Sequence, residues 1–167
     1  IKSWLLSART IRNRWGQTPG SNEDTPVHTI FALFTLNACG ISWKEIKVEF
    51  QKEINWIKKT YKEREYVYEE MQFEYDNSDE YGKKYGRLRL RHFTLPAVGN
   101  FFIQIDKVQD ALIVARDILS QQFSGGWGPS KDELTMWATQ QALELVEGVR
   151  INILPDINNF QYLSARL

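Results

Sequence analysis

Apolar residues recur three or four positions apart in several segments of the chain, and this spacing predicts helices. It is clearest over residues 27–38, 43–61 and 106–123, and a further helix is expected from about 132 to 148. A short helix is expected near the beginning, within 4–14. The sequence therefore predicts a mainly α protein.

The period changes from helical spacing to strict alternation between residues 67 and 91. Leu88 and Leu90 alternate with Arg87, Arg89 and Arg91. In an earlier stretch, polar residues alternate with the apolar or aromatic residues Val67, Met71, Phe73 and Tyr75. Alternation of this kind is typical of strands. We therefore expect a β-hairpin inserted at about 65–93, within a single domain that spans 1–149. Residues 95–105 are apolar but match no element, and 150–167 are expected to form an irregular tail or a docking segment.

Capping residues set the expected ends of the helices. Pro26 follows a Thr and suits a first helical position, and Ser42 with Glu45 has the spacing of a capping box. Gly148 is the expected carboxyl-terminal cap of the helix that starts near 132. Cys39, the last residue before a helix-ending glycine, is expected to be a small buried side chain.

One pattern of residues occurs twice in the chain. Trp15-Gly16 precedes Thr25 and Thr29, and a second set of the same kind consists of Gly126, Trp127, Gly128, Thr135 and Thr139. In each set the two threonines are one helical turn apart, so they share a face of the helix. This repetition predicts a repeated loop-and-helix unit, in which the Trp ring covers the end of the following helix.

The string Gly125-Gly126-Trp127-Gly128, followed by Trp137 to Leu145, resembles the repeat of the prenyltransferase, squalene cyclase and terpene cyclase superfamily. Residues 9–57 and 107–148 resemble two degenerate copies of it. The resemblance implies a partial α/α toroid, in which helix pairs stack around a centre, and here the β-hairpin would interrupt it.

Charge and composition narrow the classes of function. The 21 Lys and Arg residues balance the 21 Asp and Glu residues, so no global positive field attracts nucleic acid, and a nucleic-acid partner is not favoured. No apolar run is long enough for a membrane span. The single cysteine excludes an internal disulfide framework and fits a reducing compartment, so a cytoplasmic location is expected. Because the first residue is Ile1, we expect a piece of a larger protein.

The candidate catalytic residues are Glu23 and Asp24. Together with Thr25 they resemble the second half of the acidic motif with which class II terpene cyclases protonate an alkene, and the resemblance places Glu23 at the position of the acid. The alternative is that Asp24 or Thr25 only caps a helix, which is common before proline. His28, His92 and Cys39 do not have the spacing of metal ligands, so neither a metal nor a cofactor is expected.

The candidate binding residues lie on the hairpin. They are Arg87, Arg89, Arg91, Tyr66, Tyr68 and His92, and Tyr and Arg are enriched at protein interfaces. Pairing of the arginines with Glu70 and Glu74 across the strands is the alternative explanation. The favoured hypothesis is a non-catalytic module that binds a partner protein, another domain or a small apolar ligand. A terpene cyclase-like enzyme is the alternative.

Overall fold

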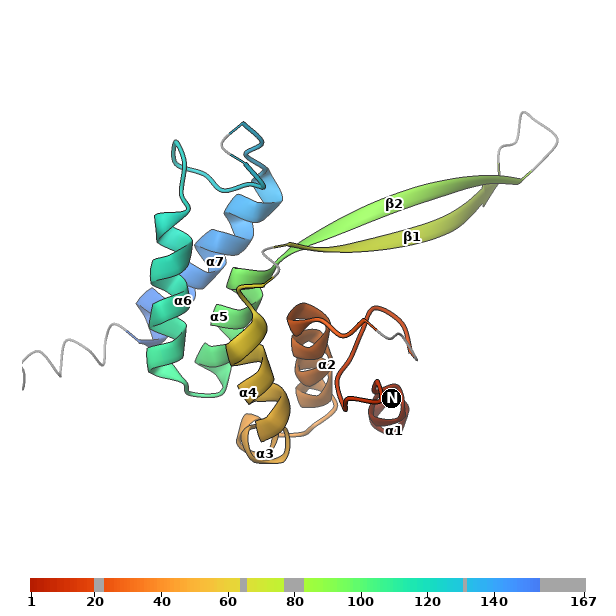
Figure 1. Cartoon of the computed structure of the whole chain (residues 1–167), viewed down its shortest axis with the longest axis horizontal. Helices are drawn as coiled ribbons and strands as arrows, with labels where there is room; N and C mark the ends of the chain where they lie inside the picture. Colours follow the sequence, from red (N-terminus) through yellow and green to blue (C-terminus); the bar gives the residue numbers. More distant parts are fainter. Residues whose placement is uncertain (20–22, 64–65, 77–82, 131, 154–167) are drawn as a thin grey trace, which may run out of the picture.

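The structure is a computed structural model that describes residues 1–19, 23–63, 66–76, 83–130 and 132–153. These residues are mainly helical, as the sequence predicts (Figure 1). The elements are α1 (Lys2–Ser7), α2 (Pro26–Ala38), α3 (Trp43–Glu49), α4 (Gln51–Thr60), β1 (Tyr66–Asp76), β2 (Lys83–Phe93), α5 (Thr94–Gln104), α6 (Val108–Ser120) and α7 (Met136–Asn152).

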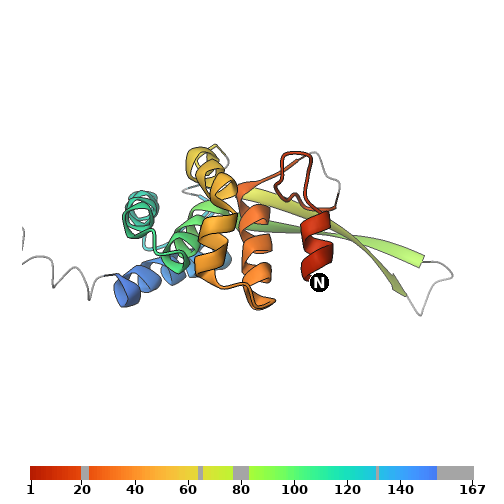
Figure 2. The same ribbon diagram turned by 90° about the horizontal axis from the view of Figure 1, so that it is seen from below.

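The helices form two layers. Helices α2, α5 and α7 form a central row, in which α5 packs against both of its neighbours (Figure 2). Helix α1 flanks α2, and α6 flanks α5 and α7. Helix α4 also packs on α2, and an ion pair of 2.6 Å between Lys58 and Asp110 joins it to α6. Helix α3 contacts α2 and α4. Apart from the consecutive pair α3 and α4, the chain alternates between a flanking helix and a helix of the central row.

The antiparallel hairpin stands between α4 and α5 and projects away from the helices (Figure 1). Its register places Glu70 opposite Arg89 and Tyr66 opposite Phe93. The hairpin forms the connection from α4 to α5, the middle helix of the central row. The segments that lead into α2 and α7 are loops. Of its side chains, the structure describes Val67 and those from Arg91 to Phe93.

Helix α5 is an element that the sequence analysis missed. Pro96 and Gly99 lower the helix propensity of this segment. Pro96 is tolerated because it lies in the first turn, where backbone N–H groups have no intrahelical partner. Gly99 allows α7 to come close, since a Cβ at this position would lie 2.5 Å from Cδ1 of Leu145. Tertiary packing therefore outweighs the local preference.

The predicted helix over 43–61 is divided in two at Phe50. The capping box is confirmed: Ser42 Oγ accepts from the backbone N–H of Glu45 at 3.2 Å, and the Ser42 N–H donates to Glu45 Oε2 at 2.8 Å. The Ser42 hydroxyl also donates to Glu45 Oε2 at 2.6 Å. This hydrogen bond, together with that from the Ser42 N–H, lowers the pKa of the Glu45 carboxyl. Phe50 is 2% exposed and leaves helical geometry at ψ 30°, so burial of its ring accompanies the break.

Five other expectations were wrong: the Gly148 cap, the start of the tail, the start of α7, the end of α1 and the burial of Cys39. Helix α7 continues through Gly148 to Asn152, so Gly148 is not a cap and the first residues of the predicted tail are helical. Residues 154–167 of that tail lie outside the described residues.

Helix α7 also begins later than expected, and α1 ends at Ser7 rather than near residue 14. Cys39 is exposed, because the C-cap of α2 lies at the surface.

The two tryptophan loops have the same hydrogen bonds. Trp15 N donates to Thr29 Oγ1 at 3.3 Å, and Trp127 N donates to Thr139 Oγ1 at 3.0 Å. In both loops the tryptophan carbonyl also accepts from the backbone N–H of the N-cap threonine, Thr25 or Thr135. The backbone of each tryptophan is thereby fixed to the first turn of the following helix.

The indole ring, by contrast, binds the preceding helix rather than the following one. Trp15 Nε1 donates to the Leu5 carbonyl at 2.8 Å, and Trp127 Nε1 donates to the Ile118 carbonyl at 2.7 Å. Both carbonyls lie in the last turn of a helix. The Ile118 carbonyl also accepts from the Gln121 N–H at 3.1 Å, so the indole is its second donor. The expectation that the ring covers the following helix was therefore wrong. Each tryptophan joins two helices: α1 with α2, and α6 with α7.

Gly128 lets the second loop close tightly. A Cβ on this residue would lie 1.8 Å from the Glu133 carbonyl oxygen, and no side chain fits there. The turn before α7 therefore depends on glycine at this position.

We expect Trp127→Ala to lower the free energy of unfolding by about 3–5 kcal/mol, because its ring is 2% exposed and the hydrogen bond from Nε1 to the Ile118 carbonyl is lost. Urea unfolding followed by circular dichroism measures this change. Trp4→Ala is the matched control, since Trp4 is 58% exposed, and we expect it to cost less than about 1 kcal/mol. Equal effects of the two substitutions would contradict the role of Trp127.

Candidate functional site

A groove of about 270 Å³ lies over α5, between α2 and α7 and next to the base of the hairpin. Phe31 and Phe34 of α2 form one wall, and Gln141 and Glu144 of α7 form the other. The floor comes from α5, through Pro96, Ala97 and Asn100. One wall is therefore apolar and the other is polar.

The two walls occupy corresponding positions of the repeated unit. Phe31 and Phe34 follow Thr29 by the same intervals at which Gln141 and Glu144 follow Thr139. Because each threonine is fixed to its tryptophan in the same way, α2 and α7 begin from equivalent anchors. The repeat thus supplies both walls, and divergence between its copies makes them chemically different.

The end of β2 closes the groove. His92 packs edge-on against Phe31, with ring centroids 5.1 Å apart, and its ring lies 6.4 Å from that of His28. His28 Nδ1 is in turn 2.7 Å from Thr25 Oγ1. On the other side, the Phe93 N–H donates to Gln141 Oε1 at 3.3 Å. The base of the hairpin is therefore attached to α2 and to α7.

The predicted binding residues divide into three groups. His92 lines the groove. Arg91 forms an ion pair of 2.6 Å with Glu133, which ties the hairpin to the loop before α7. The side chains of Arg87, Arg89, Tyr66 and Tyr68 lie outside the described residues. The sequence analysis missed Phe34, Gln141 and Glu144, although their matching places after the two threonines were a signal in the repeat.

The acidic motif forms a structural clamp. Asp24 is 3% exposed in its side chain, and its two carboxylate oxygens lie 3.2 Å from Arg12 and 2.9 Å from Arg14. The Arg14 guanidinium also stacks over the Trp56 ring of α4, at 4.0 Å from its centroid. Thr25 caps α2 by accepting from the His28 N–H. Glu23 is exposed, and neither acidic residue lines the groove.

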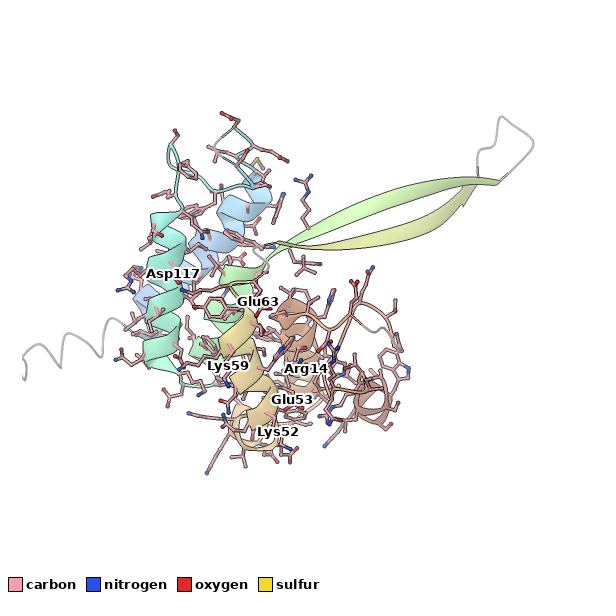
Figure 3. All side chains as sticks on the ribbon, viewed as in Figure 1. Arg14, Lys52, Glu53, Lys59, Glu63 and Asp117 are labelled. Carbon is pink, nitrogen blue, oxygen red and sulfur yellow. The ribbon has the colours of Figure 1, made fainter. Side chains whose placement is uncertain are left out.

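A second groove, of about 280 Å³, lies between α4 and α6 and is polar. The pair Lys62–Asp117, at 2.7 Å, crosses it, and Asp117 comes from α6 (Figure 3). The hydrogen bond to Asp117 raises the pKa of Lys62, and burial raises that of Tyr61. Both groups therefore keep their protons near neutral pH, and an internal ion pair already satisfies the charges here.

Two further observations concern metals and membranes. Within the described residues, no group of three or more His, Cys, Asp or Glu side chains is placed to hold a metal ion. None of the helices in these ranges combines the length and the apolar character needed to cross a membrane.

No protein-family model, curated protein or solved structure matches this chain. Its function is therefore inferred from its own residues and geometry.

We expect Asp24→Asn to destabilise the fold by about 1–2 kcal/mol, because it weakens the charge-assisted hydrogen bonds of a carboxylate that is 3% exposed, while the remaining arginines, 63% and 24% exposed, stay hydrated. Chemical unfolding measures the loss. Glu23→Gln is the matched control and should change stability by less than about 0.5 kcal/mol, since Glu23 is exposed. An Asp24→Asn variant as stable as the original chain would contradict the structural role of Asp24. It would then favour the catalytic alternative.

Proposed function

We propose that this chain is a non-catalytic interaction module that binds a partner protein through the groove on its central row. The observation that carries the proposal is the pair of unlike walls, with Phe31 and Phe34 facing the α7 wall of Gln141 and Glu144. An open groove of this size suits one anchoring side chain of a partner better than a whole small molecule.

The walls define the chemistry of the anchor. An apolar or aromatic side chain gains free energy by covering Phe31 and Phe34. A neighbouring Lys or Arg of the partner lies within reach of the exposed carboxylate of Glu144. Asn100, on the floor, offers an amide to the backbone or a polar side chain of the partner. The preferred partner is therefore a segment in which an apolar residue stands beside a basic one.

The hairpin extends this surface beyond the groove. His92 belongs to both, so a bound segment continues naturally from the groove onto β2. The proposal extends to the hairpin, where the partner is also recognised by Arg87, Arg89, Tyr66 and Tyr68. The register that sets Glu70 opposite Arg89 also suits cross-strand pairing, which would leave Arg87 as the better candidate for a partner contact.

The likeness to the α/α toroid also belongs to the proposal. The alternation of flanking and central helices and the two equivalent tryptophan anchors support a partial toroid with an inserted hairpin. The cyclase-like alternative has less support. Both oxygens of Asp24 are engaged by arginines, and Glu23 does not line the groove.

Selection of short peptides from a random display library against the purified chain tests the proposal. We expect the selected peptides to share an aromatic or large aliphatic residue next to Lys or Arg. Glu144→Lys should weaken their binding at least about tenfold, since a charge pair is replaced by a repulsion. Fluorescence anisotropy measures the affinity.

Glu49→Lys is the matched control, because it makes the same charge change at an exposed position of α3 outside the groove. It should leave the affinity unchanged. Peptides without a basic residue, or equal losses in both variants, would show that the α7 wall does not select the partner.

A further inference from the structure

Corresponding faces of α2 and α7 differ in their exposure. On α2, the residues Val27, Ile30, Leu33 and Leu36 are all 0% exposed. The corresponding positions of α7 are Trp137, Gln140, Leu143 and Val146. Leu143 is 53% exposed, Gln140 is exposed, and the other two are only partly buried. One face of the repeated unit is thus covered in the first copy and open in the second.

The order of the helices explains this difference. Helix α2 is covered by the helices that follow it, since α4 and α5 pack on it. Helix α7 packs against α5 and α6, which precede it, and its Leu145 reaches α5 at Gly99. Within the described residues no helix follows α7. Its open face therefore lies where the next helix of the central row would stand.

The other end of the row carries a groove at the complementary place. Helix α5 packs against both members of the tryptophan-linked pair α6 and α7. The corresponding pair, α1 and α2, bears a groove of about 250 Å³. His28 and Ala32 line it, and they correspond to Ala138 and Ala142, which are fully buried in α7. No helix within the described ranges fills this groove.

Exposed apolar side chains mark both ends. Trp4 is 58% exposed and Phe31 41% exposed at the α1–α2 groove. At the other end Met136 is 90% exposed and Ile151 55% exposed, on the same helix as Leu143. Apolar surface of this kind at both ends of one row of helices is typical of an interface.

The charges of the two ends are opposite. The charged residues of segment 1–19 are all basic: Lys2, Arg9, Arg12 and Arg14. Segment 132–152, which includes α7, carries the acidic residues Asp132, Glu133, Glu144 and Glu147 and one basic residue, Arg150. Arg12 and Arg14 bind Asp24, Glu133 binds Arg91, and Glu147 binds Arg150. Lys2 and Arg9 at one end and Asp132 and Glu144 at the other lie outside these ion pairs, and their opposite signs favour the approach of one end to the other.

We propose that α7 of one copy of this chain docks in the α1–α2 groove of a second copy, in the position that α5 takes on α6 and α7. The partner at this surface is thus the chain itself, joined head to tail. Such a contact closes into a symmetric dimer when two copies engage each other, and otherwise forms an open chain of copies. The interface adjoins the partner-binding groove, since Phe31 lines both grooves and Glu144 belongs both to the α7 wall and to the docking end.

Sedimentation velocity of the full chain over a range of concentrations tests the proposal. We expect reversible association of the original chain and only monomer for Leu143→Glu and for Thr35→Arg, which alter the two ends separately. Thr35 is exposed and lines the α1–α2 groove. Val48→Glu, at a 73% exposed position of α3, is the matched control and should associate normally.

A mixture of the two monomeric variants distinguishes two kinds of contact. In the head-to-tail contact, α7 of one copy meets the α1–α2 groove of the other, whereas in the alternative the same surface of both copies meets itself. Each variant keeps one intact end, so the mixture should form a one-to-one heterodimer, which labelling one variant with a fluorophore detects. The proposal is overturned if the original chain stays monomeric, if either variant still associates, or if the mixture does not. Unchanged thermal unfolding of the variants, whose substituted positions are exposed, separates loss of association from loss of folding.

Discussion

The fold depends on two tryptophans that each hold two helices together. In both loops the indole N–H satisfies a carbonyl in the last turn of the preceding helix, while the tryptophan backbone binds a threonine in the first turns of the next. A helix end buried without such a partner would cost free energy. A single residue thus sets the spacing and the direction of a helix pair, and it does so at both ends of the molecule.

This anchoring explains why the candidate site has two unlike walls. Because α2 and α7 start from equivalent anchors, corresponding residues of the two helices border the same groove. The tryptophan and threonine residues that the two units share fix the geometry of the helices. The residues that differ between the units give the two walls their chemistry. Phe31 and Phe34 became an apolar wall, whereas Gln141 and Glu144 became a polar one. The two walls therefore differ in chemistry although their helices start from equivalent anchors.

The hairpin is the departure from that framework. It takes the connection into α5, and an isolated two-stranded ribbon has little stability of its own. Its base is held to the helices through Arg91, His92 and Phe93, which bind the α7 loop, α2 and α7 in turn. These contacts make the ribbon an extension of the groove.

The sequence by itself determined what depends on neighbours along the chain: the spacing of the amphipathic helices, the alternation of the hairpin, the capping box at Ser42 and the repeated tryptophan loops. It did not determine what depends on distant partners. Helix α5 contains Pro96 and Gly99, which oppose a helix locally, and it forms because α7 packs closely on it. The groove joins α2, the end of β2, α5 and α7, and only tertiary packing brings these segments together. The role of Asp24 was likewise set by Arg12 and Arg14, whose approach follows from how the loop folds rather than from the motif in which Asp24 stands.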